Sequence, residues 1–154
     1  MDTPSEKIVE LLEKYLHPLL EEKGFKYLKS QKRYKRKQGI LESHISIFFN
    51  RYNLLGSSER FDLYLTVHSP KYRKWEMEFY DMEKRDLNRI SGAHMQDFKD
   101  WDMQYIEGSW YEIAKVDEGK VMQSLRANIE NIGLPFFSHF DSLGAAVAYM
   151  KNPS

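Results

Sequence analysis

The most conspicuous candidates for chemistry form a basic run between Lys26 and Lys37. Lysine and arginine neutralise phosphates and aromatic rings stack on bases, so this composition suits single-stranded nucleic acid or another anionic partner. Lysine also guards exposed edge strands against pairing with another sheet, and this interpretation stays open beside the first. The residues that would bind an anionic partner are Lys29, Lys32, Arg33, Tyr34, Lys35, Arg36 and Lys37.

A second set of polar residues alternates with apolar ones in the segments 41–50 and 60–68. If these segments pair as a hairpin, the polar residues share one face of a sheet. Two histidines with a carboxylate can bind a metal ion or perform acid–base work, although their spacing matches no recognised ligand pattern. A solvated face, a face partly covered by C-terminal helices, and a groove for a small molecule or peptide are the alternatives. The candidate residues on this polar face are His44, Asn50, Asp62, Tyr64 and His68.

A third group, His94, Asp97 and Asp100, would lie together on a helix. Its spacing is looser than that of metal sites, and an acidic surface turn is the simpler interpretation. The sequence contains no phosphate-binding loop, no Gly-x-Ser-x-Gly elbow, no His-Glu-x-x-His and no dinucleotide fingerprint. We therefore expect no metal ion, no cofactor and no assigned catalytic residue, which favours a binding protein over an enzyme.

The elements that must position these residues begin with a helix. Thr3 can cap it and Pro4 suits its first position. Pro18 predicts a kink near Lys14, and Gly24 predicts the end of the helix. Its apolar residues recur at helical spacing: Ile8, Leu11, Leu12, Tyr15, Leu16, Leu19 and Leu20.

Strands follow this helix. Residues 25–37 indicate a strand broken near Ser30, and the segments 41–50 and 60–68 alternate clearly. A further alternating run covers residues 75–79. Period two with one apolar face is typical of an antiparallel sheet covered on one side, here by the N-terminal helix.

The second half of the chain is harder to interpret. Residues 83–90 favour a helix, 94–105 a strand or irregular structure, and 110–114 a last strand. Asp117 caps a helix that Gly133 should end, with Pro135 preventing its continuation. A short helix over 142–150 closes the chain. The sequence thus predicts one α+β domain over residues 1–154, with four or five antiparallel strands between the N-terminal helix and C-terminal helices.

Short motifs spread over most of the chain share the pattern of a known family. They are Leu16–Leu20 with Gly24 and Phe25, Tyr34 in the basic strand, Ile45–Asn50, Phe61–Leu65, and Gly133–Phe137. These motifs resemble the domain of unknown function 4304, an uncharacterised and mostly bacterial family. The resemblance implies an α+β fold and brings no established activity or catalytic residue. Members often carry Gln where this chain has Asn50.

Composition narrows the function classes. Lysine plus arginine and aspartate plus glutamate number 23 each, without the positive excess of a dedicated nucleic-acid binder. There is no cysteine, no signal-peptide pattern and no apolar run near the about 20 residues that span a bilayer. We expect a cytoplasmic, non-catalytic module that binds a protein partner and no membrane, for example in the manner of an immunity protein. Nucleic-acid binding through the strand at 26–37 and an enzyme using the His44/His68 face are the alternatives.

Overall fold

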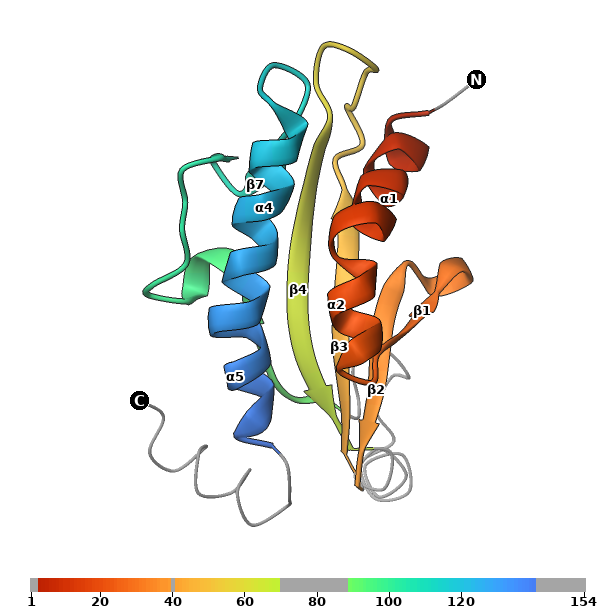
Figure 1. Ribbon diagram of the computed structural model, residues 1–154, viewed down its shortest axis with the longest axis vertical. Helices are drawn as coiled ribbons and strands as arrows, with labels where there is room; N and C mark the ends of the chain where they lie inside the picture. The colour runs from red at the N-terminus through yellow and green to blue at the C-terminus, as the bar shows by residue number, and fades with distance from the viewer. Residues whose placement is uncertain (1–2, 40, 70–88, 141–154) are drawn as a thin grey trace, which may run out of the picture.

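The computed structural model describes residues 3–39, 41–69 and 89–140 and confirms the α+β class (Figure 1). Helices from both ends of the chain lie on one side of an antiparallel sheet. Within the described residues the sheet contains seven strands, more than the four or five expected. The expected strand at 75–79, most of the helix at 83–90 and the helix at 142–150 lie outside the described residues. None of the described helices is long and apolar enough to cross a membrane.

The N-terminal helical segment is divided in two. Helix α1 (Pro4–Tyr15) begins where the Thr3 Oγ1 accepts a hydrogen bond from the Glu6 amide at 3.1 Å, as predicted. Helix α2 (His17–Glu22) follows after Leu16, so the break lies two residues beyond the expected kink. Pro18 is then in the first turn of α2, where its missing amide hydrogen disturbs nothing. Gly24 ends the segment with a φ of 90°, a conformation that favours glycine.

The sheet is built around two long strands, β3 (Leu41–Phe49) and β4 (Arg60–His68). On one side lie β2 (Arg33–Gln38) and β1 (Lys26–Leu28), which are joined by a 3₁₀ turn, η1 (Lys29–Gln31), near the predicted break. On the other side, β5 (Arg89–His94) and β7 (Trp110–Glu112) both pair with β4, and β6 (Ile106–Glu107) pairs with β7. The turn η2 (Met95–Asp97) follows β5. Residues 89 and 90 therefore belong to a strand. The helix predicted over 83–90 is wrong for these last two residues.

The C-terminal helices correct a second prediction. Asp117 caps α4 (Glu118–Asn128) as expected, accepting a hydrogen bond from the Gly119 amide at 2.9 Å. The helix does not end at Gly133, however, but continues through a π-helical turn, η3 (Ile129–Gly133), into α5 (Leu134–Ser138). A Cβ at Gly133 would lie 3.1 Å from Leu65 Cδ2, so glycine serves close packing against β4. Pro135 is tolerated because it lies in the first turn of α5.

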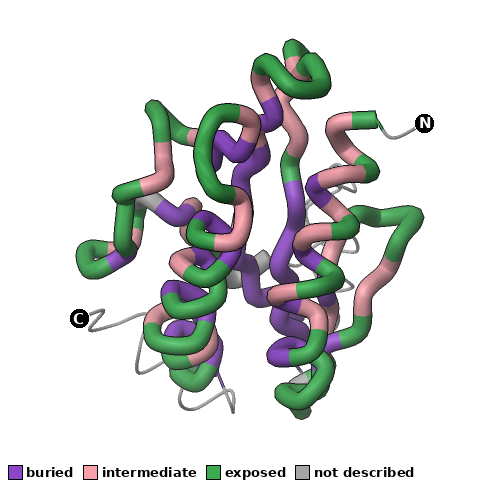
Figure 2. Tube along the Cα trace, turned by 45° about the horizontal axis from the view of Figure 1, so that its top comes forward, coloured by how far each residue is buried: buried purple, intermediate pink, exposed green. Residues whose placement is uncertain are grey.

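The main core lies between the helices and the sheet, as the buried stretches of Figure 2 show. The helix-facing side chains of β4, namely Phe61, Leu63, Leu65 and Val67, are fully buried. The opposite side of the sheet is not open: His44, Thr66 and His68 are buried as well. Of the alternatives that the sequence leaves open for the polar face, the structure therefore shows a covered face in the first half of β3 and the second half of β4.

One buried hydroxyl connects three parts of the core. The Tyr111 Oη of β7 accepts hydrogen bonds from Trp101 Nε1 at 2.9 Å and from Asn128 Nδ2 at 3.1 Å. Burial raises the pKa of Tyr111 to about 12. The hydroxyl therefore remains protonated and joins β7, α4 and the segment after η2.

Removing this hydroxyl tests its role. Tyr111→Phe leaves two buried N–H donors without their acceptor and should lower the free energy of unfolding by about 1–3 kcal/mol. Urea denaturation followed by circular dichroism measures the change. Tyr105→Phe, at a half-buried tyrosine, is the matched control, and equal effects of the two substitutions would contradict this assignment.

Candidate functional site

The register between β3 and β4 assembles the predicted polar face. His44 lies opposite Thr66, and Ser46 lies opposite Tyr64. The neighbouring strands extend these two cross-strand rows, because side chains opposite each other in a ladder share a face. One row contains Lys35, His44, Thr66 and Gly92; the other contains Arg33, Ser46, Tyr64 and His94. Arg33 and Lys35 of the basic strand are thus part of the polar face, although the sequence presents the two as separate sites.

The two histidines of the predicted site lie in contact. The rings of His44 and His68 stack with their centroids 4.1 Å apart. Arg33 Nη1 lies 3.1 Å from His44 Nδ1, and only the arginine can donate in this pair. Burial, the neighbouring His68 and Arg33 lower the pKa of His44 to about 3. His44 is therefore neutral with its proton on Nε2, which makes it neither a metal ligand through that atom nor a base near pH 7.

One carboxylate and one hydroxyl lie beside this pair. The Glu42 Oε2 forms an ion pair with Lys35 Nζ at 3.0 Å, and its Oε1 lies 3.9 Å from His44 Nε2. The His68 Nε2 is within hydrogen-bonding distance of Thr66 Oγ1, at 2.7 Å. The contact with Glu42 is too long for a hydrogen bond, so the buried His44 Nε2 has no hydrogen-bond partner among the described residues, and neither does Arg33 Nε.

His94 joins the polar face from β5, which the sequence did not predict. Its Nδ1 lies 3.1 Å from Asp62 Oδ2, and its ring stacks on Tyr64 at a centroid distance of 4.2 Å. Burial raises the pKa of the Asp62 carboxyl, and the adjacent His94 opposes this rise. A carboxylate that orients a half-exposed histidine is one component of an acid–base site. The part of the chain that the structure describes gives His94 Nε2 no hydrogen-bonded nucleophile.

The remaining candidates of the polar face and of the third group have local roles. Asn50 lies after the end of β3, where its Oδ1 accepts a hydrogen bond from the Tyr52 amide at 2.8 Å. Asp97 Oδ2 accepts a hydrogen bond from the His94 amide and so caps η2, while Asp100 is exposed. Among the described residues, no three histidine or acidic side chains are placed to hold a metal ion.

The basic run divides over three surfaces. Arg33 and Lys35 belong to the polar face, and Lys37 lies opposite Glu42 in the same register. Tyr34 points to the helices and is only 1% exposed, so its ring is not available to stack on a base. Arg36 lies over the Phe25 ring, 4.6 Å from its centroid, and donates to the Lys23 carbonyl at 3.1 Å. Lys29 and Lys32, in and just after η1, are exposed on a different side.

A surface that the sequence did not single out lies in the loop at residues 50–59 between β3 and β4, called here the β3–β4 loop. Tyr52 and Leu54 are 72% and 65% exposed, and Leu55 is exposed beside them. Val116, in the segment after β7, is a further exposed apolar residue, and this segment lies at the same end of the molecule as the loop (Figure 1). The signal available in the sequence was the pair Leu54-Leu55 next to Gly56, since turns are normally polar.

Hydrogen bonds fix the β3–β4 loop from within. The Asn53 side chain accepts from the Arg60 amide and donates to the Arg60 carbonyl, both at 2.8 Å. The Leu54 amide donates to the Ser58 carbonyl at 2.8 Å, closing the tip. Tyr52 and Leu54 are thus displayed by an ordered turn, in which Gly56 supplies a φ of 81°.

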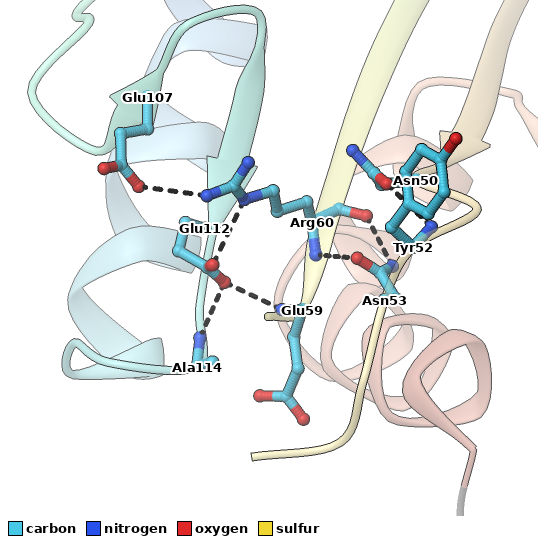
Figure 3. Close-up of polar contacts among 8 residues, drawn as sticks. All are labelled: Asn50, Tyr52, Asn53, Glu59, Arg60, Glu107, Glu112 and Ala114. Atoms are coloured by element: carbon cyan, nitrogen blue, oxygen red, sulfur yellow. Dashed lines mark hydrogen bonds and ion pairs between the residues drawn. The ribbon is translucent and has the colours of Figure 1, made fainter. Parts of the chain in front are cut away.

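A buried carboxylate anchors the base of this loop (Figure 3). The Glu112 Oε2 accepts hydrogen bonds from the amides of Glu59 and Ala114, at 2.8 and 3.1 Å, and its Oε1 accepts from Arg60 Nε at 3.2 Å. These donors outweigh burial and keep the pKa of Glu112 below its usual value. Glu59 is itself fully buried and pairs with Lys7 Nζ at 2.7 Å. The loop is therefore tied both to β7 and to α1.

The stacked histidines predict a pH dependence. Because His44 stays neutral in the folded state, the unfolded chain binds more protons than the folded protein below pH 6.5. The free energy of unfolding should therefore decrease as the pH is lowered, by up to about 1.4 kcal/mol per pH unit, down to the folded-state pKa of about 3. Urea denaturation at pH 7.5 and 4.5 should show that His44→Gln removes about 1–3 kcal/mol of this loss. His139→Gln, at an exposed histidine, is the control. An unchanged pH dependence in His44→Gln would contradict the buried neutral ring.

Comparisons with known proteins agree with the motifs found in the sequence. The family described as Domain of unknown function (DUF4304) matches residues 16–139. No curated protein and no solved structure matches the chain. The matched residues extend from the end of α1 to the end of α5 and include the β3–β4 hairpin with its loop. Because this match covers well over half of the sequence, the chain belongs to the domain of unknown function 4304 family.

Proposed function

We propose that this protein is a non-catalytic interaction module that binds a partner protein through the β3–β4 loop. The observation that carries the proposal is the exposure of Tyr52, Leu54 and Leu55 on one ordered turn. Neighbouring exposed apolar residues on a soluble domain are typical of interaction sites. An inhibitor of the immunity-protein type is one form that such a module takes.

The composition and rigidity of the loop support this proposal. The Arg51 guanidinium lies over the Tyr52 ring, 4.7 Å from its centroid. Tyrosine and arginine are the residue types that most often dominate binding energy at protein interfaces. Because hydrogen bonds already hold the turn, a partner would not have to order it, and less free energy would be lost on association.

The two alternatives have less support. Binding of single-stranded nucleic acid would need exposed rings beside the basic residues, whereas Tyr34 is buried and Arg36 packs on Phe25. Catalysis by the His44/His68 pair would need a titratable base, whereas the pKa of His44 is lowered to about 3. We keep the cytoplasm as the proposed compartment, because the chain contains no cysteine to form disulfides.

Photo-crosslinking in the cell of origin tests the proposal. A photo-reactive benzoylphenylalanine in place of Tyr52 should give a discrete crosslinked species that mass spectrometry identifies as a protein. The same group in place of Met103, another exposed apolar residue, should not give it. With the identified partner, Leu54→Ser should weaken binding about tenfold or more in calorimetry, since loss of a central apolar contact costs above about 1.4 kcal/mol.

Met103→Ser serves as the matched control in the binding measurement and should leave the affinity unchanged. Equal crosslinking from both positions, or a partner that binds Leu54→Ser as tightly as the native chain, would contradict a docking role for the β3–β4 loop.

A further inference from the structure

A groove of about 330 Å³ lies between α1 and the β1–η1–β2 region, and is called here the α1 groove. One wall is an acidic stripe on α1, made by Glu6, Glu10 and Glu13. The opposite wall carries Lys29 and Lys32. The half-buried side chains between the walls are mainly apolar: Val9, Tyr27 and Phe49. The volume is at the lower end of known ligand pockets, which suits side chains of a short segment rather than a folded element.

The charges on the two walls are not paired with opposite charges in the described part of the protein itself. Within the described residues, none of the three glutamates and neither lysine forms an ion pair. Glu10 is instead four residues from Glu6 and three from Glu13, a spacing at which like charges on a helix repel. Glu13 lines the groove, and its carboxylate adds to burial in raising the pKa of Tyr27.

Lys32, which follows the last residue of η1, has an unusual backbone conformation. It has a φ of 52° and is the one non-glycine residue of the described chain in the left-handed region. This backbone conformation is unfavourable for a lysine, and glycine or asparagine would adopt it with less strain. It places the ammonium over the Phe49 ring, 5.2 Å from its centroid, at the edge of the α1 groove. Strained residues of this kind are concentrated at binding sites.

We propose that the α1 groove binds an extended peptide segment of a partner protein, in which one apolar side chain is flanked by a basic and an acidic side chain. The basic side chain lies against the acidic stripe, the apolar side chain on Val9, Tyr27 and Phe49, and the acidic side chain at Lys29 and Lys32. This proposal rests on the proposed function and names the chemistry of its partner. Phe49, which lines the α1 groove, ends β3, and the β3–β4 loop begins at the next residue.

The test is the selection of random twelve-residue peptides, displayed on phage, against the full-length protein. Enriched peptides should contain both signs of charge around a large apolar residue. Glu10→Lys should weaken their binding at least tenfold in fluorescence anisotropy, and Glu22→Lys, at an exposed glutamate on α2, should not. Amide shifts on peptide addition should centre on Val9, Tyr27 and Phe49.

Lys32 provides a readout that a structural role would not give. Lys32→Asn should weaken peptide binding while the urea midpoint stays the same or rises, and Lys32→Arg should retain binding. Peptides that bind Glu10→Lys as well as the native chain, or no enrichment at all, would overturn the groove proposal. Crosslinking from Tyr52 is independent of these variants, so failure of the groove leaves the docking role of the loop intact, whereas failure of the crosslinking contradicts the proposed function itself.

Discussion

The pairing of β3 with β4 is the constraint on which the rest of the structure depends. Its register runs without interruption from Glu42 opposite His68 to Phe49 opposite Phe61. Since side chains alternate along a strand, this register sends Ile45 and Leu65 toward the helices and the histidines to the other side. A slip of one residue would exchange the two sets, leaving imidazoles under α1 and α4. Core and polar face are therefore fixed by the same hydrogen bonds.

The polar face and the base of the β3–β4 loop deal with buried charge in different ways. Beside Arg33, burial keeps His44 neutral. Glu112 instead stays ionised, because two amides and Arg60 donate to it. The hydrogen bonds to Glu112 also fix the backbone, because a carboxylate that accepts from several donors holds each donor in place. This explains why a loop with an apolar tip is ordered.

The sequence predicted correctly those features that depend on contacts between residues close together in the chain. Thr3, Asp117 and Gly24 act at helix ends as expected, and the alternation in 41–50 and 60–68 predicted the central hairpin. Gly133 could not be interpreted in this way, because its role depends on Leu65, which is remote in sequence. The arrival of His94 beside Asp62 likewise depends on the pairing of β5 with β4. The division of the basic run needed the register of β2, since the charges alone do not show which face each one occupies.

The position of the β3–β4 loop also bears on how the chain is made. Hairpins form in about 1–10 μs, whereas contacts between remote segments form later. The loop closes a hairpin that is complete in sequence at His68, well before the start of α4 at Glu118. During synthesis, its internal hydrogen bonds can thus form while Glu112 is still untranslated. The apolar tip would then be presented by a nascent chain whose core is unfinished, at the stage when chaperones and neighbouring chains compete for such surfaces.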